Sequence, residues 1–340
     1  MVTHSTKTRT LWVDIAKAIA IVLVVLYHSA LFLVADDLTP EYWTKINRTF
    51  QTFRMPLFFF AAGLFASSVI NRSWAMLWKS RLALLAWTFI LWTVLRYAFF
   101  WIVPSPLPLD ESNPVLLLMA PVWPQTGLWF LHALAIFFVA AKAMKVLRIP
   151  PVVQVVGAAL VSAAFFAGVS VGNISYNGMF QYFVFFLTAC HYREQITQGI
   201  QSLPRWSFIV AGLAFGAIGG AAQALGSEQV YGVMFVVSAA AVIAGLTFSR
   251  AIENLPGASK VAWVGEHTLP IYVSHVLIIA GIAAILGQFR DVHLIDTLGP
   301  LLPIAVAALA LALSLALWGG LTATRMGSYF YSPPALFSRA

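Results

Sequence analysis

Ten long apolar segments follow one another along the chain, separated by short polar connections. They cover roughly residues 11–34, 54–70, 82–103, 128–141, 151–170, 179–191, 206–224, 231–248, 262–286 and 300–321. An α-helix needs about 20 mostly apolar residues to cross the hydrocarbon core of a bilayer, where it satisfies its own backbone hydrogen bonds. The pattern predicts an all-α integral membrane protein with about ten transmembrane helices, formed as a single domain over residues 1–340.

The composition leaves little room for a large soluble domain. Hydrophobic residues make up 61% of the 340 residues and charged residues only 9%, whereas soluble domains contain about 25% charged residues. The net charge is +8, but the Lys and Arg residues cluster at the ends of the apolar segments. That distribution indicates membrane topology, so we expect no nucleic-acid partner. The single cysteine, Cys190, and the absence of a His-Glu-x-x-His motif indicate no metal site.

The basic residues also predict the orientation of the chain. With the N-terminus inside, fourteen of the twenty Lys and Arg residues fall in cytoplasmic segments and four in outer segments. Because cytoplasmic loops carry the excess of basic residues, both termini should be cytoplasmic, as short tails at 1–10 and 322–340. The cytoplasmic set comprises Lys7, Arg9, Arg72, Lys79, Arg81, Lys142, Lys145, Arg148, Arg193, Arg205, Arg250, Lys260, Arg325 and Arg339.

The first apolar segment carries three titratable residues on one face. Lys17 and His28 lie within about 20° of each other around a helix, and Asp14 lies within about 40° of His28. Charged groups in hydrocarbon cost about 2.5–3.5 kcal/mol each, so they usually face a protein interior and have a function. We therefore predict a site inside the membrane. Asp14 and Lys17 also interrupt the apolar run, which favours an uncleaved first helix over a signal peptide.

Five sequence motifs occur in order along the chain. They are WVDIAKAIAIVLVVLYH at 12–28, RMPLFFFAAG at 54–63, WKSRL at 78–82, GLWFL at 127–131 and EHTLPIYVSH at 266–275. This ordered set resembles the acyltransferase-3 family of membrane-bound O-acyltransferases. In that family a basic residue in the first helix is followed by ten residues and a histidine, and Lys17 and His28 have this spacing.

The resemblance implies about ten helices and transfer of an acyl group, usually acetyl from acetyl-CoA, to a carbohydrate hydroxyl. Acetyl-CoA or another acyl-CoA would then be the donor substrate from the cytoplasm, with no permanently bound cofactor. It also implies a bacterial plasma (inner) membrane. The sequence departs from the family at 84–87, where a second arginine and a proline are replaced, and near 188–190, where a glycine is replaced. The esterase-like domain fused to many members is not in the 340 residues.

Two histidines are the candidate catalytic residues. His28 has the residue type and position of a general base, since imidazole has an unperturbed pKa of about 6.5. His275, one turn after Tyr272, is a candidate second acid–base group or substrate-binding group. The alternative for either histidine is a buried hydrogen bond between helices.

The candidate binding residues divide between the two sides of the membrane. Lys17 would hold a phosphate of CoA or orient the thioester, with Asp14 fixing its position, and Lys79 with Arg81 would bind CoA phosphates. Snorkelling of Lys17 and the bias toward cytoplasmic basic residues explain the same residues without function.

The outer candidates are Arg54 and Trp129. We expect Arg54, before Pro56 at the outer start of the second helix, to bind the acceptor or polarise the acyl carbonyl, or to anchor the interface. Trp129, after the outer loop 104–127, would stack on a sugar or belong to an interfacial aromatic belt. Tyr272 completes the binding set. Arg54 or Arg96 would be the extra cation that a succinyl donor requires.

Two alternative functions stay open at this point. Intramembrane Asp, Lys and His residues also suit a proton-coupled secondary transporter, although no pair of repeated halves is visible. A scaffold subunit of a polysaccharide export complex is a weaker interpretation. The sequence identifies neither the glycan nor the oligomeric state. We also expect the glycines at 212, 216 and 220 to allow close helix packing.

Overall fold

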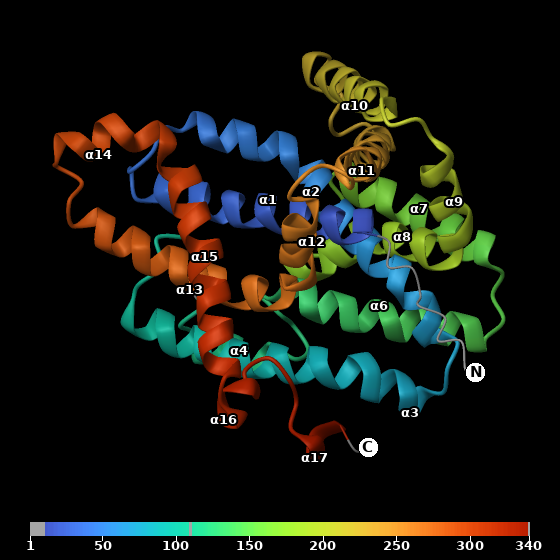
Figure 1. Ribbon diagram of the computed structural model, residues 1–340, viewed down its shortest axis with the longest axis horizontal. Helices are drawn as coiled ribbons and strands as arrows, with labels where there is room; N and C mark the ends of the chain where they lie inside the picture. The colour runs from blue at the N-terminus through green and yellow to red at the C-terminus, as the bar shows by residue number, and fades with distance from the viewer. Residues whose placement is uncertain (1–10, 109–110, 339–340) are drawn as a thin grey trace.

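The computed structural model describes residues 11–108 and 111–338, and every regular element among them is helical (Figure 1). The major helices are α1 (Leu11–Ala35), α2 (Tyr42–Ile70), α4 (Ala83–Ile102), α6 (Trp129–Val146), α7 (Pro151–Phe166), α8 (Ile174–His191), α10 (Ser207–Ala224), α11 (Val233–Ile252), α13 (Thr268–Gly287) and α15 (Leu302–Thr322). The shorter elements are α3 (Trp74–Leu77), η1 (Trp78–Leu82), α5 (Pro114–Met119), α9 (Arg193–Ser202), α12 (Ala258–Glu266), α14 (His293–Leu298), η2 (Gly299–Leu301), α16 (Arg325–Ser328) and α17 (Ala335–Ser338).

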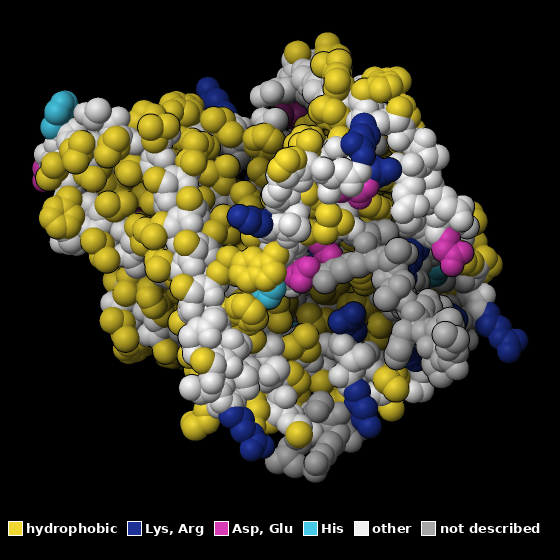
Figure 2. Space-filling view, viewed as in Figure 1, with side chains coloured by type: hydrophobic (Ala, Val, Ile, Leu, Met, Phe, Trp, Pro, Cys, Tyr) yellow, Lys and Arg dark blue, Asp and Glu magenta, His cyan; other side chains and the backbone are white. Residues whose placement is uncertain are grey.

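The membrane fold expected from the sequence is confirmed. Within the described ranges, eight helices are long and apolar enough to cross a membrane. The other two predicted segments form α7, which is apolar but only 16 residues long, and α8, which carries more polar side chains. These two helices pack against each other. Figure 2 shows hydrophobic side chains over most of the face formed by α13, α14 and α15, as expected for a surface in contact with lipid.

Helix α1 lies at the centre of the bundle. It packs against α2, α11, α12, α13 and α15, so its polar face meets protein. Asp14 is 2% exposed although it is charged. Because hydrocarbon provides no hydrogen-bond partners, a helix with this composition is stable only where neighbouring helices surround it.

Loops predicted for the same side of the membrane lie together. At one side, the Lys142 ammonium at the end of α6 donates to the carbonyls of Ile70 and Arg72, after α2. At the other side, the Thr39 hydroxyl donates to the Gly299 carbonyl at 2.6 Å. The cytoplasmic location of the termini stays a prediction, and Lys7, Arg9 and Arg339 lie outside the described residues.

The second helix begins earlier than predicted, which corrects the expected position of Arg54. Helix α2 starts at Tyr42, so Arg54 and Pro56 lie in its interior and not at its outer start. Arg54 is 6% exposed, and its guanidinium donates to the Asn47 carbonyl at 3.1 Å. Hydropathy detects the part of a helix that lies in hydrocarbon, and it does not detect the polar turns that extend beyond it.

The predicted segment 262–286 is two helices rather than one. Helix α12 ends at Glu266 and α13 begins at Thr268. Pro270 has no N–H to donate to the carbonyl four residues earlier, which favours a break at this point. The ring of His267 at the junction lies 4.4 Å from the rings of both Trp263 and Trp318.

The C-terminal segment is held against the third membrane segment by three tryptophans. The indole of Trp78 donates to the Phe337 carbonyl at 3.3 Å, and those of Trp87 and Trp92 donate to the carbonyls of Tyr329 and Phe330, both at 2.7 Å. These bonds tie α16 and α17 to the side of η1 and α4 (Figure 1). The π-helical turn η1 between α3 and α4 carries Lys79 and Arg81.

The glycine stripe of α10 does not pack as predicted. A Cβ at position 212, 216 or 220 would meet no atom within 4 Å. Helix α10 lies at the edge of the bundle (Figure 1), and these three glycines face away from its neighbours. Close backbone approach occurs elsewhere, at Gly265 in α12, where a Cβ would collide with the Asp14 carbonyl of α1 and lie 3.1 Å from the Ala18 nitrogen.

We predict that Gly265→Ala lowers the free energy of unfolding by about 1–3 kcal/mol, because the methyl group would push α12 away from α1. The matched control is Gly212→Ala, which has open space around the new methyl group. It should leave stability within about 1 kcal/mol or raise it, since Ala favours a helix. Thermal unfolding in detergent measures both variants. Equal melting temperatures for the two variants would contradict the close contact of α12 with α1.

Candidate active site

Two cavities lie one after the other along the centre of the bundle. The inner cavity has a volume of about 360 Å³ and is lined by Asp14, Lys17, Arg81, Phe58, Phe130 and Tyr272, among others. The outer cavity has a volume of about 750 Å³ and is lined by His28, Arg54, Arg96, Glu111, Trp129 and Tyr182, among others. The names inner and outer follow the predicted orientation of the chain, in which the N-terminus is cytoplasmic. They bring together most of the residues predicted for the site.

A larger cavity of about 980 Å³ lies at the ends of α2, α6 and α8, next to α9. Its lining includes Lys145, Arg148 and Arg193 and none of the residues predicted for the site. The candidate site is therefore built from the inner and outer cavities.

The inner cavity combines cations with apolar walls. Lys17 forms an ion pair with Asp14 at 2.7 Å and lies over the ring of Phe65 at 5.2 Å. Arg81 reaches the same cavity from η1, and Thr268 at the start of α13 also lines it. A helix N-terminus favours anions because its first N–H groups have no partners within the helix. This cavity can therefore accept an anionic group bonded to an apolar chain.

Two predicted residues line neither cavity: His275, which is buried behind His28, and Lys79. Lys79 is exposed on η1, whereas Arg81, two residues later, lines the inner cavity. Lys79 is thus positioned to meet a ligand only beyond the mouth of the cavity.

His28 and His275 form a direct contact between α1 and α13. The Nδ1 of His28 lies 3.2 Å from the Nε2 of His275 and 2.9 Å from the Val24 carbonyl. The Nδ1 of His275 lies 2.9 Å from the Ile271 carbonyl. Since a carbonyl only accepts, both Nδ1 atoms carry protons. The Nε2 of His275 then accepts from His28, and the Nε2 of His28 keeps its lone pair, on a ring that lines the outer cavity.

Arg54 lies close to this pair. Its guanidinium lies over the ring of Tyr27, 3.9 Å from the centroid, and Tyr27 precedes His28 in the chain. The cation–π contact and the bond to Asn47 fix the guanidinium in the wall of the outer cavity. No carboxylate in the described part of the chain forms a salt bridge with Arg54.

Arg96 is held by Glu111, an acid of the outer loop to which the sequence analysis gave no role. Its Nε donates to a Glu111 oxygen at 2.7 Å, and a second nitrogen donates to the other oxygen. Glu111 also accepts from the Thr126 hydroxyl at 2.9 Å and from the Gly127 amide at 3.3 Å. This network ties the outer loop to α4. The sequence does contain a signal for this pair: the loop 104–127 has acidic but no basic residues, and the preceding apolar segment has one arginine.

Trp129 lies at the first residue of α6 and lines the outer cavity. Its ring stacks near Tyr182, with centroids 6.2 Å apart. A Cβ at Gly178 of α8 would collide with the indole, so the glycine makes room for it. The tryptophan is thus part of a cavity wall rather than of the lipid-facing surface.

The comparison with protein-family models assigns the chain to a family. A model described as an acyltransferase domain matches residues 10–319. The chain belongs to the acyltransferase-3 family. No curated protein and no solved structure matched. Membership of this family favours acyl transfer over the transporter and scaffold functions. Among the described residues, no group of three His, Cys, Asp or Glu side chains could hold a metal ion.

The acidity of Glu111 leads to a pH prediction. Burial raises the pKa of this carboxyl, but the charge of Arg96 and the hydrogen bonds from Arg96, Thr126 and Gly127 outweigh that effect, so its pKa is lowered below the ordinary 4.5. A lowered pKa means that the pair stabilises the fold above the ordinary pKa. This stabilisation is lost as pH falls through the folded value.

We therefore predict that Glu111→Ala destabilises the fold by about 3–5 kcal/mol at neutral pH, since it leaves Arg96 buried without its partner. The wild type should lose melting temperature on acidification below about pH 4.5 more steeply than the variant. Hydrogen–deuterium exchange over 111–127 should increase in the variant. Glu253→Ala, which removes a carboxylate from the more exposed pair with Arg250, is the control. Parallel pH profiles for wild type and Glu111→Ala would contradict the prediction.

Proposed function

We propose that this acyltransferase transfers acetyl from acetyl-CoA to a hydroxyl of an exported or cell-surface carbohydrate, in the plasma membrane of a bacterium. The observation that carries the proposal is that the Nδ1 of His28 is bonded to Val24 and His275 while its ring lines the outer cavity, with the cationic inner cavity next along the same bundle. One side supplies a donor-binding chamber, and the other supplies a base and an acceptor-binding chamber.

The inner cavity suits the donor. CoA is a polyanion linked through a long pantetheine arm to the thioester. Lys17 and Arg81, together with the start of α13, offer positive charge to its phosphates. Along α1, Lys17 and His28 are separated by about 16 Å at 1.5 Å per residue. The pantetheine arm can extend over this distance and bring the thioester close to His28.

His28 would act as the general base. The acceptor hydroxyl gives its proton to Nε2 as its oxygen attacks the thioester carbonyl, and the imidazolium then returns a proton to the leaving thiolate as the carbon–sulfur bond breaks. The Nδ1–H of His28, shared by Val24 and His275, stabilises the imidazolium between the two steps. His275 thus acts through His28 as a positioning residue.

Arg54 would stabilise the charge on the acyl oxygen. The tetrahedral intermediate carries an oxyanion, and a fixed cation beside it is worth more in a cavity of low dielectric constant than in water. Arg54 is fixed by Tyr27 and Asn47 and has no carboxylate partner among the described salt bridges. The same guanidinium is the cation that a succinyl donor would use.

The lining of the outer cavity supports a carbohydrate acceptor. Trp129 and Tyr27 offer aromatic surfaces, and Gln51, Asn177 and Gln181 offer amide groups. Amides donate and accept hydrogen bonds, as does a sugar hydroxyl, and aromatic rings pack against the apolar face of a pyranose. A cavity of about 750 Å³ has room for a sugar unit of a longer chain.

We predict that His28→Ala lowers kcat about 10²–10⁴-fold, with a much smaller change in KM for acetyl-CoA, because the base acts in the transition state. Purified protein in nanodiscs would be given acetyl-CoA and a crude glycan extract. Thiol release and glycan acetylation would be followed together. His293→Ala, at an exposed histidine of α14, is the matched control and should be unaffected. Full activity of a folded His28→Ala protein would exclude His28 as the base.

A further inference from the structure

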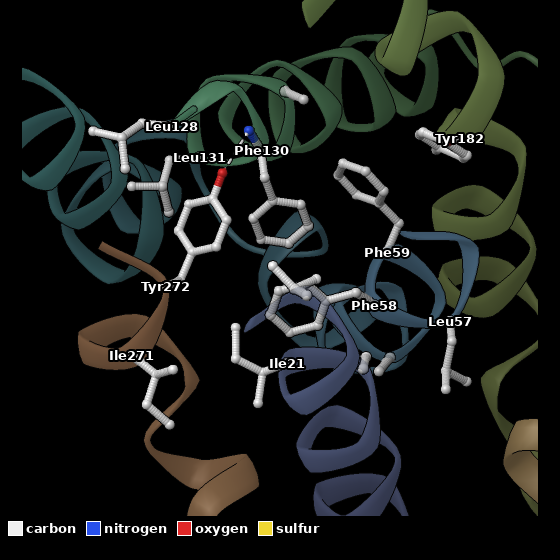
Figure 3. Packing of buried hydrophobic residues seen from close by; sticks show 14 of the residues in the cluster. Ile21, Leu57, Phe58, Phe59, Leu128, Phe130, Leu131, Tyr182, Ile271 and Tyr272 are labelled. Atoms are coloured by element: carbon white, nitrogen blue, oxygen red, sulfur yellow. Dashed lines mark hydrogen bonds between the residues drawn. The ribbon is translucent and has the colours of Figure 1, made fainter. Parts of the chain in front are cut away.

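A layer of four large side chains separates the two cavities. Ile21, Phe58, Phe130 and Tyr272 come from α1, α2, α6 and α13 and are each at most 5% exposed. Figure 3 shows Phe130 and Tyr272 side by side, with Phe58 and Ile21 next to them. The rings of Phe58 and Phe130 are stacked with centroids 4.5 Å apart, and the rings of Phe130 and Tyr272 meet edge to face at 5.4 Å.

On α6 and α13, residues that line the inner cavity are followed within one turn by residues that line the outer cavity, or the reverse. On α6, Trp129 lines the outer cavity and the next residue, Phe130, lines the inner cavity. On α13, Tyr272 lines the inner cavity, and Val276, one turn later, lines the outer cavity. Among the described residues, no side chain lines both cavities. The layer therefore closes the route between them.

The Tyr272 hydroxyl holds this layer in place. It donates to the Gly127 carbonyl at 2.8 Å and accepts from the Phe130 amide at 3.2 Å. Both partners are at the start of α6, where the first amides have no partner within the helix. The Gly127 amide is in turn bonded to Glu111. The tyrosine thus joins α13 to α6 and to the network of the outer loop.

We propose that Phe58, Phe130 and Tyr272 form a gate between the donor and acceptor cavities, and that the Tyr272 hydroxyl is its latch. The gate rests on the proposed function, because the acyl group has to pass from the inner to the outer side. In its closed state it keeps water of the outer cavity from the thioester. Otherwise a water oxygen would bond to the acyl carbon and release CoA thiol and free carboxylic acid without acceptor.

The latch is also linked to the candidate base. Tyr272 and His275 lie on successive turns of α13, and their rings are 6.0 Å apart. A movement of α13 that opens the gate therefore moves His275, and with it the contact to His28. Opening of the gate and orientation of the base are parts of one motion.

Tyr272→Phe tests the latch, because it keeps the ring and removes both hydrogen bonds. Such a loss should raise the population of the open gate roughly tenfold. The ratio of thiol released to glycan acetylated should increase by a similar factor when acetyl-CoA and the glycan extract are supplied. Tyr176→Phe is the matched control, since its hydroxyl also donates to a backbone carbonyl, that of Val122, but outside the gate. It should leave the ratio unchanged.

A second measurement does not depend on acyl transfer. Leu134, which lines the inner cavity, would be replaced by cysteine in a Cys190→Ser background. A small, charged, membrane-impermeant methanethiosulfonate reagent would be added from each side of the membrane in turn. From the outer side, Tyr272→Phe should speed modification roughly tenfold, whereas the Tyr176→Phe control should not.

The outcomes separate the gate from the proposed function. Equal modification rates and equal ratios in wild type and Tyr272→Phe would overturn the gate. No thiol release from acetyl-CoA by the wild type would contradict the proposed function, while faster modification in Tyr272→Phe would still support the gate.

Discussion

Hydrocarbon offers no hydrogen-bond partner, so the polar groups of α1 depend on the helices around it. Asp14 and Lys17 pair with each other at one end, and His28 meets His275 near the other. This requirement places α1 in the centre of the bundle, where five helices surround it. The same requirement brings α13 to α1, and the contacts with Val24 and His275 use only the Nδ1 of His28. The helix at the centre of the bundle therefore carries the candidate base.

Several features of the fold that depend on local sequence pattern were predicted correctly. The apolar segments gave the membrane class, and the spacing of Lys17 and His28 placed both on one face of α1. The Arg54 position was wrong because α2 extends into polar residues that hydropathy does not detect. The break before α13 was missed because the predicted segment was drawn through the polar residues Glu266 and His267, although Pro270 is typical of the first turn of a new helix. The roles of Glu111 and of the Tyr272 hydroxyl depend on partners distant in the chain, which periodicity does not reveal.

In the proposed function, the two cavities divide the chemistry of acyl transfer between them. The inner one has cations and apolar walls, and the outer one has a base, amides and aromatic rings. A thioester can therefore be held in one environment and attacked from the other, while the layer around Phe130 keeps the two apart. The outer loop contributes through Glu111, which fixes Arg96 and the start of α6 together. Changes in this loop would act on the acceptor side and, through the bond between Gly127 and Tyr272, on the layer between the cavities.

The central claim is that donor and acceptor meet from opposite sides of the membrane through these cavities. The direct test uses proteoliposomes with a uniform protein orientation, radiolabelled acetyl-CoA on one side only and a crude cell-surface glycan extract on the other. We predict labelled glycan when acetyl-CoA faces Lys17 and Arg81, and none when the two solutions are exchanged or when His28→Ala replaces the wild type. Labelling that occurs only with donor and acceptor on the same side would contradict the account.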